Sequence, residues 1–303
     1  MTVVNSRYKL VKKIGAGSFG SVYKAVDMEK NIYVAVKVES KSSDKKRLAH
    51  EINIYNNFVS CKYIPKLFWY GSENNYNFLV MNYMGASFEK LFEKYNKSFS
   101  LKTIIMLSID LLKILEYIHD NNIIHRDLKP DNIVIGNGNN SNNIYLLDFG
   151  LSKNFMSKDN GQHIELVKNK SLVGSMRYAS IRNHKGYEQS RRDELESLGY
   201  ILLYFLKGGN LPWNGLPSSN KEEKSKKICQ LKGSIDLEDL CSDVPEEYRL
   251  LIAYARKLKF DAKPNYSYLI NLFKKLLVNS GFQYDKKYDW VENQEREIVI
   301  MNG

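Results

Sequence analysis

The sequence predicts an α+β fold in which a small strand-rich half precedes a larger, mainly helical half. Short segments rich in Val, Ile, Tyr and Phe occupy about the first 80 residues, and such segments are typical of strands. Beyond residue 83, apolar residues recur at helical spacing over long stretches. We expect the boundary between the halves near Gly85, and the cleft between them is the natural place for a ligand.

The first half is expected to contain four strands and one helix. The stretch Val34-Ala35-Val36-Lys37-Val38 alternates apolar and polar contacts over a short span, as strands do. The helix is charged at its start and then amphipathic, with Leu48, Ile52 and Tyr55 at helical spacing. The strands are expected over residues 8–15, 21–27, 32–39 and 77–83, and the helix within residues 43–58.

Long helices are expected in the second half. The first carries an apolar stripe from Ile104 to Ile118 and ends near Asp120. Polar residues interrupt this stripe, so we do not expect it to span a membrane: Ser108, Asp110 and Lys113. Further helices are expected over residues 195–205, around 248–258 and over 266–277.

Two polar segments complete the prediction. Residues 136–143 consist of Gly, Asn and Ser between two apolar runs, a pattern that predicts the exposed loop of a hairpin without chemistry. Residues 221–227 carry charges of both signs and predict the solvated face of a helix.

The composition is that of a soluble globular protein. Of 303 residues, 43% are hydrophobic and 26% are charged, which excludes wholesale disorder and fibrous architectures. Cys61, Cys229 and Cys241 are few and far apart, which disfavours a disulfide framework or a zinc site and fits a reducing compartment. The first residues lack the pattern of a signal peptide, so an intracellular protein is expected.

The chain is strongly basic. Forty-five Lys and Arg against 34 Asp and Glu give a net charge of +11. Such a field attracts anionic partners, namely nucleic acid, anionic lipid, or acidic and phosphorylated protein. Charge alone does not choose among these partners, and a solvated basic surface is the simplest interpretation.

A glycine-rich loop follows the first predicted strand. Its sequence is Gly15-Ala16-Gly17-Ser18-Phe19-Gly20. Glycines let backbone N–H groups approach phosphate oxygens closely, because no Cβ intervenes. A dinucleotide-binding loop would lead directly into a helix. Here a predicted strand follows, so we expect the loop to be a flap that joins two strands.

Charged residues at four further places complete a constellation. Lys37 lies at the end of an apolar strand, and Glu51 follows on the predicted helix, where it can pair with the lysine. Later come His125-Arg126-Asp127-Leu128-Lys129-Pro130-Asp131-Asn132 and, after another apolar strand, Asp148-Phe149-Gly150. Each carboxylate alone fits a cap or a turn, but the ordered set is far more specific.

This ordered set resembles the eukaryotic protein kinase family. The resemblance implies a bilobal fold, with a small antiparallel-sheet lobe that has one main helix and a larger, mainly helical lobe. It implies that Asp127 accepts the proton of the substrate hydroxyl and that Glu51 orients Lys37 on the α- and β-phosphates of ATP. Asn132 and Asp148 would hold Mg²⁺.

The same resemblance implies further site residues. Lys129, two residues after the base, matches the pattern of serine/threonine-specific enzymes and would steady the transferring phosphoryl group. His125 is expected to be a packed scaffold residue. The residues expected around ATP are Ile14, Gly15, Gly17, Ser18, Gly20, Val22, Ala35, Lys37, Met81 and Met84.

A narrower resemblance, to the casein kinase 1 family, runs from about Ser6 to Trp290. Most protein kinases have Ala-Pro-Glu after the activation segment, whereas this chain has Ser180-Ile181-Arg182, as that family does. Residues 170–181, 188–200, 211–215 and 263–268 also match. We therefore expect a kinase domain over residues 6–290, with lobes over 6–84 and 85–290, and a short tail over 291–303.

This resemblance implies a serine/threonine protein kinase that transfers the γ-phosphate of MgATP to acidic or phosphate-primed proteins. Its anion site matches Lys170, Arg177, Gly215 and Lys224, and arginine suits phosphate because its planar fork donates two parallel hydrogen bonds. A monomer in the cytoplasm and also in the nucleus is expected, without a specific nucleic-acid partner. The hydroxyls of Ser171 and Ser175 are expected to pack or form hydrogen bonds.

Three features depart from the family pattern. Asn82 stands at the start of the hinge where glutamate is usual, although adenine is normally held there by backbone groups. Glu194 replaces an aspartate that ties its helix to the catalytic loop, so one extra methylene must be accommodated. The sequence has no long regulatory tail after Trp290, so activity without a tail-based brake is expected.

Two rival interpretations remain at this stage. A catalytically weak, kinase-like scaffold is disfavoured because all five expected active-site residues are present: Lys37, Glu51, Asp127, Asn132 and Asp148. A basic nucleic-acid-binding module would concentrate Lys and Arg on one surface, whereas here they are dispersed along the chain.

Overall fold

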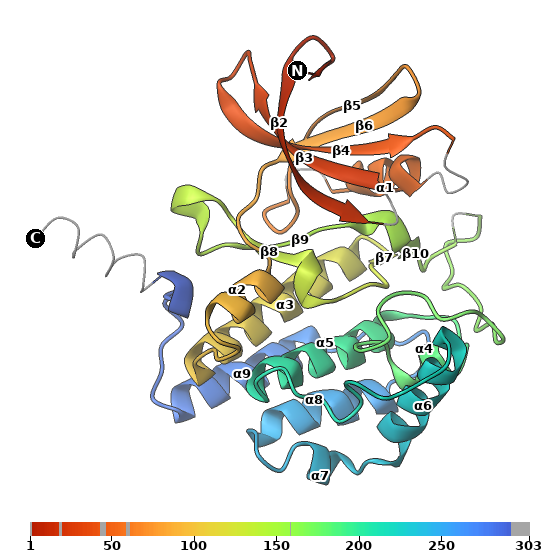
Figure 1. Cartoon of the computed structure of the whole chain (residues 1–303). Coiled ribbons are helices and arrows are strands. Elements are labelled where there is room, and N and C mark those ends of the chain that lie inside the picture. The colour runs from red at the N-terminus through yellow and green to blue at the C-terminus, as the bar shows by residue number, and fades with distance from the viewer. Residues whose placement is uncertain (1, 18–19, 43–46, 59–60, 158, 292–303) are drawn as a thin grey trace, which may run out of the picture. The chain divides into compact units, whose positions relative to one another are not determined.

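The computed structural model of the chain describes residues 2–17, 20–42, 47–58, 61–157 and 159–291. They form two compact units, the first within Met1–Ala86 and Val134–Ser152 and the second within Ser87–Ile133 and Lys153–Gly303. The first unit is built on a six-stranded sheet and the second is mainly helical, which confirms the predicted α+β class (Figure 1).

The sheet of the first unit is antiparallel throughout, with the strand order β1-β2-β3-β4-β6-β5. Its strands are β1 (Val3–Val4), β2 (Tyr8–Gly17), β3 (Gly20–Asp27), β4 (Ile32–Ser40), β5 (Leu67–Glu73) and β6 (Tyr76–Asn82). The four predicted strands are confirmed as β2, β3, β4 and β6, whereas β1 and β5 were not predicted. The apolar core against this sheet consists of Val4, Tyr8, Ala25, Val34, Val36, Phe78 and Val80.

Helix α1 (Arg47–Tyr55) begins where a side chain of the sheet accepts its first N–H groups. The carboxylate of Glu39 on β4 accepts hydrogen bonds from the backbone N–H of Arg47 and of Leu48, at 3.2 and 3.3 Å. A carboxylate in this place also complements the positive end of the helix dipole. The predicted amphipathic helix is therefore confirmed over its described part.

The hairpin predicted around residues 136–143 is also present in the first unit. Strands β8 (Ile133–Ile135) and β9 (Ile144–Leu146) pair in a two-stranded sheet, and a short 3₁₀ turn, η2 (Gly138–Asn140), lies in the loop between them. After β9 the chain enters another turn, η3 (Phe149–Leu151), which lies against α1.

The second unit is organised around two pairs of packed helices (Figure 1). Helix α3 (Leu101–Asp120) packs against α9 (Tyr266–Asn279), and α5 (Arg191–Leu206) packs against α8 (Glu246–Lys257). These four helices were predicted. The remaining elements are α2 (Phe88–Lys94), β7 (Ile123–Ile124), η1 (Pro130–Asn132), β10 (Lys153–Asn154), α4 (Ile181–His184), α6 (Lys221–Ser234) and α7 (Leu237–Leu240).

The segment after α9 returns to α3. The carboxylate of Asp110, on α3, accepts hydrogen bonds from the hydroxyls of Tyr284 and Tyr288. The ring of Tyr288 stacks on Trp290 at a centroid distance of 4.6 Å, and Trp290 meets Phe88 edge to face. Tyr288 and Trp290 are both buried, so this segment is part of the core of the second unit.

No helix in the described ranges has the length and apolar character needed to cross a membrane. The same part of the chain holds no group of three or more His, Cys, Asp or Glu side chains that could bind a metal ion.

Candidate functional site

Three of the predicted site residues meet in the first unit. Lys37 lies on β4, Glu51 lies on α1, and Asp148 comes between β9 and η3. Nζ of Lys37 lies 2.6 Å from Oε2 of Glu51 and 2.9 Å from Oδ1 of Asp148. Asp148 has a left-handed backbone with φ 67°, which is uncommon outside glycine. The structure thus brings one ammonium between two carboxylates from distant parts of the sequence.

The charge of Lys37 is secured by these neighbours. Burial alone would lower the pKa of Lys37, but attraction to Glu51 and Asp148 outweighs it and raises the pKa above its usual value. Glu51 is buried and lies on the face of α1 that points to the protein interior. The lysine is therefore a fixed positive charge, held in one position by two partners, and such a group can bind an anionic ligand.

The glycine-rich loop joins β2 to β3, as predicted. Gly15 pairs with Val22 and Gly17 with Gly20 across the two antiparallel strands. Gly20 has φ 124°, and a Cβ at this position would lie 2.1 Å from the carbonyl oxygen of Val38. Only glycine fits there. Ser18, also predicted to contact ATP, lies outside the described residues.

The other residues predicted around the nucleotide lie on or beside the same sheet. Ala35 on β4 and Met81 on β6 are buried and directly paired across the strands. Ile14 is exposed and Met84 is half-buried. The side-chain amide of Asn82 binds a neighbouring backbone group: its Oδ1 accepts a hydrogen bond from the N–H of Lys66 at 2.7 Å.

Asp127 is the centre of a second cluster, which belongs to the second unit. Its Oδ2 accepts a hydrogen bond from Nζ of Lys129 at 2.8 Å, and its Oδ1 accepts one from Oγ of Ser175 at 2.7 Å. The side-chain amide of Asn132 donates to the backbone carbonyl of Asp127 at 2.9 Å. Asp127 is 5% exposed, so its carboxylate is held in one orientation by these donors.

Just before Ser175, the activation segment, which is the stretch that precedes Ser180, closely approaches residues 125–132, the catalytic loop by the resemblance. Gly174 has φ 92°, and a Cβ there would lie 2.2 Å from the carbonyl oxygen of Arg126. Any side chain at this position would push the two segments apart. The hydrogen bond from Ser175 to Asp127 depends on this approach.

Glu194 on α5 ties the catalytic loop to the helical core. Its Oε1 accepts a hydrogen bond from the backbone N–H of Arg126 at 2.7 Å, and its Oε2 accepts one from Nε2 of His119 at 2.7 Å. Arg126 has a left-handed backbone with φ 66°, and the bond to Glu194 helps to hold it there. The extra methylene of Glu194 is accommodated, because each carboxylate oxygen has a donor.

The same contacts keep Glu194 ionised. Burial alone would raise the pKa of Glu194, but the hydrogen bond and charge of His119, together with the N–H of Arg126, lower it below the usual value. His119 is in turn hydrogen-bonded through Nδ1 to the hydroxyl of Tyr266 on α9. His125 is buried, and its Nδ1 accepts the backbone N–H of Asp127 at 3.2 Å, which is the geometry of a scaffold residue.

A cavity of about 400 Å³ lies in the second unit beside the partners of Asp127, since Lys129 and Ser175 are part of its wall. Four cationic side chains and one carboxylate line it: Lys129, Arg177, Lys221, Lys224 and Asp131. The balance of charge favours an anionic occupant.

The residues predicted as the anion site only partly coincide with this cavity. Arg177, Gly215 and Lys224 line it, whereas Lys170 does not. The ammonium of Lys170 contacts the carboxylate of Glu188, which also accepts a hydrogen bond from Lys153 at 2.8 Å. Sequence reasoning missed Lys221, because within residues 221–227 only Lys224 matched the anion site and the rest were interpreted as a solvated helix face.

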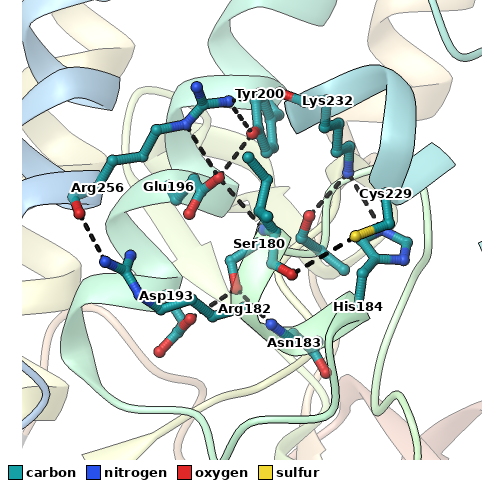
Figure 2. A network of polar contacts seen from close by, with 12 residues as sticks. Ser180, Arg182, Asn183, His184, Asp193, Glu196, Tyr200, Cys229, Lys232 and Arg256 are labelled. Atoms are coloured by element: carbon teal, nitrogen blue, oxygen red, sulfur yellow. Dashed lines mark hydrogen bonds and ion pairs between the residues drawn. The ribbon is translucent and has the colours of Figure 1, made fainter. Parts of the chain in front are cut away.

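The Ser180-Ile181-Arg182 segment is anchored by acidic residues of α5 (Figure 2). Oγ of Ser180 donates to Oδ1 of Asp193 at 2.6 Å, and the backbone N–H of Ile181 donates to Oε1 of Glu196 at 3.3 Å. Burial raises the pKa of Asp193 to about 6. The chain after the activation segment is thus fixed to the same helix that carries Glu194.

Comparison with known families agrees with this geometry. Residues 8–279 match the family model described as a protein kinase domain. The match includes both clusters, the glycine-rich loop and the cavity, and it ends at the last residue of α9.

Proposed function

The chain belongs to the protein kinase family, and on this premise we propose that it is a serine/threonine kinase of the casein kinase 1 type. A protein kinase is a phosphotransferase that uses ATP and a divalent metal ion. The finer proposal is that it transfers the γ-phosphate of MgATP to serine or threonine near acidic or phosphorylated residues. The observation that carries it is the Lys129–Asp127 contact at 2.8 Å beside a cavity whose charged lining residues are mostly cationic.

The described residues can perform the parts of this reaction that fall to the protein. Asp127 accepts the proton as the substrate hydroxyl oxygen bonds to the γ-phosphorus and the bond from that phosphorus to the bridging oxygen of ADP breaks. Lys129 orients the Asp127 carboxylate through their hydrogen bond and places a positive charge where the transferring group gains negative charge. Lys37 offers its ammonium to the phosphates of ATP.

The residues proposed to hold the metal ion have suitable chemistry. Mg²⁺ prefers oxygen ligands, and Asp148 supplies a carboxylate. The amide nitrogen of Asn132 is engaged with the carbonyl of Asp127, which leaves the amide oxygen as the ligand atom. When bound, the metal ion neutralises phosphate charge.

Two features support the proposed substrate class. Lys129 donates a hydrogen bond directly to the carboxylate of Asp127, as expected for an enzyme that phosphorylates the hydroxyls of serine and threonine. The guanidinium of Arg177 faces the ring of Tyr204 at 5.4 Å and lines the cavity, so it is presented as a planar donor to an anion. A catalytically weak scaffold would not need the Lys37–Glu51–Asp148 geometry, which is intact.

Peptide substrates test the proposal. We would compare peptides that differ only in the acceptor (Ser, Thr or Tyr) and in one neighbouring residue (phosphoserine, Asp or Asn). Ser and Thr peptides with a neighbouring anion should be phosphorylated best. Arg177→Ala should remove most of the preference for the anionic neighbour, whereas Arg249→Ala, a control in which the arginine is paired with Glu246, should retain it.

Two results would contradict this proposal. Equal loss of activity by Arg177→Ala on primed and unprimed peptides would remove the assignment of Arg177 to the anion site. A preference for the Tyr peptide would remove the assignment to serine/threonine kinases.

A further inference from the structure

Helix α6 contributes a buried lysine to the second unit. Lys232 is 1% exposed, although it lies on a helix whose other lysines are exposed or half-buried. Its Nζ donates to three backbone carbonyls: those of Met176 at 3.1 Å, Arg177 at 3.0 Å and Ala179 at 2.7 Å. All three acceptors belong to one short stretch of the activation segment.

On its other sides Lys232 lies against aromatic rings and an imidazole, and the charges of Glu196 and Arg256 act on it. The ammonium lies over the rings of Tyr200 and Trp213, at 4.6 and 4.9 Å from their centroids. Nε2 of His184 is 3.5 Å away. Among the described contacts of Lys232, none is an ion pair with a carboxylate, and the nearby Glu196 is paired with Arg256.

Such an arrangement is costly, because an ammonium without an anionic partner loses its hydration on burial. A methionine of similar length would pack there without that loss. Unlike methionine, the lysine fixes the orientation of three carbonyl groups, because its ammonium carries three donors on one atom. Trp213 adds a fourth bond of the same kind, from Nε1 to the carbonyl of Arg177 at 2.8 Å.

The stretch held in this way forms one wall of the substrate cavity. Met176, Arg177 and Tyr178 line the cavity, and Ser175, just before them, donates to Asp127. The segment is thus fixed to the catalytic carboxylate at one end and to Lys232 over the next residues. The hydrogen bonds to Lys232 fix the backbone of this stretch. Because the Arg177 side chain leaves that backbone, the same contacts set its direction.

We propose that Lys232 is a positioning residue for the protein substrate: it holds Met176–Ala179 in the conformation that shapes the cavity and orients Arg177. It acts through the backbone of this segment and does not touch the substrate. This inference rests on the proposed function for the identity of the cavity, and it predicts that Lys232 governs the affinity for protein substrate and not for ATP.

The test is Lys232→Met, with Lys226→Met as the matched control on the same helix. Lys226 is exposed and pairs only with Glu222 in the described structure. In Lys232→Met, KM for an acidic peptide should rise about tenfold, while kcat and KM for ATP change less than about twofold. The control should match the wild-type protein in all three constants. Hydrogen exchange at the amides of residues 176–180 should be faster in Lys232→Met alone.

A milder variant guards against misfolding. Trp213→Phe keeps an aromatic ring but removes the donor to Arg177 and part of the buried indole, and it should shift peptide KM in the same direction by a smaller factor. An unchanged peptide KM in folded Lys232→Met, or equal losses in peptide KM and kcat, would overturn the inference. If the wild-type protein phosphorylates no peptide, the proposed function fails, and the exchange measurement alone then decides whether Lys232 holds the segment.

Discussion

Glu194 and Lys232, two buried charged residues of the second unit, hold loops in place through backbone hydrogen bonds. Glu194 accepts the N–H of Arg126 in the catalytic loop, and Lys232 donates to three carbonyls of the activation segment. The family resemblance implied the tie made by Glu194, whereas the role of Lys232 was not predicted, because its partners lie 50 or more positions away. By contrast, Lys37, Glu51 and Asp127 were predicted from motifs, since their spacing is itself specific.

Shortening Glu194 tests the tie to the catalytic loop. In Glu194→Asp the carboxylate cannot reach both Arg126 and His119, so one donor loses its partner and the strained backbone of Arg126 is less well held. We expect the free energy of unfolding to fall by about 1–3 kcal/mol and kcat to fall more than KM for ATP. Thermal unfolding and steady-state kinetics measure these effects, and a variant equal to the wild-type protein in both would contradict the role given to Glu194.

The pH dependence of stability tests the burial of Lys232. Burial lowers the pKa of Lys232 to about 7 from an ordinary value of 10.5. Below pH 7 the lysine is charged in both the folded and the unfolded chain, and the full cost of burying the charge is present. Between pH 7 and pH 10.5 only the unfolded chain holds the proton, so this cost is relieved as pH rises.

The stability of the wild-type protein relative to Lys232→Met should therefore rise with pH. The expected gain from pH 7 to pH 9 is on the order of 2 kcal/mol. Urea unfolding of both proteins at these two values gives the difference directly. A difference that is independent of pH, or that falls as pH rises, would show that Lys232 is not a buried ammonium near neutrality.

The glycine-rich hairpin between β2 and β3 shows why element types were predictable and some element edges were not. Alternating apolar residues predicted both strands, and the strand after the glycines excluded a dinucleotide loop. The extension of β3 back to Gly20 was not predicted, because it depends on contact of that glycine with Val38 of the neighbouring strand. Strand β5 was missed because its residues are half-exposed and do not alternate clearly.

Gly20→Ala should damage this hairpin. The new Cβ would meet the carbonyl of Val38, and alanine is strained at φ 124°. We expect a loss of about 1–3 kcal/mol in stability and a rise of about tenfold in KM for ATP. Gly138→Ala is the control, since Gly138 also has a positive φ, of 57°, but its Cβ would meet open space. Equal KM values for ATP in the two variants would contradict a specific role for Gly20.

At the scale of the whole chain, the packing of the second unit continues beyond the family match. The match ends at residue 279, whereas Tyr284, Tyr288 and Trp290 contact α3 and the aromatic core. We therefore propose that the domain ends at Trp290. The sequence resemblance also extends to Trp290. Tertiary contacts explain why the domain continues this far: Asp110 accepts hydrogen bonds from both tyrosines, and the local sequence does not reveal that pairing.

Removal of residues 280–303 should destabilise the protein. It takes away two buried aromatic side chains and leaves Asp110 without the hydroxyls of Tyr284 and Tyr288. Since loss of a single large buried aromatic side chain typically costs about 3–5 kcal/mol, we expect a loss of at least that size. Calorimetry of the full chain and of the shortened chain measures it. Equal melting temperatures would place the end of the domain at α9 instead.

The central claim is that Asp127 of the second unit accepts the proton when a phosphoryl group moves from ATP to protein. The most direct measurement is transfer of labelled γ-phosphate from ATP to casein and to an acidic peptide by the wild-type protein and by Asp127→Asn, which keeps the shape of the side chain. We predict phosphate on serine or threonine with the wild-type protein and a rate about 10²–10⁴-fold lower with the variant. Comparable transfer by both proteins would contradict the account.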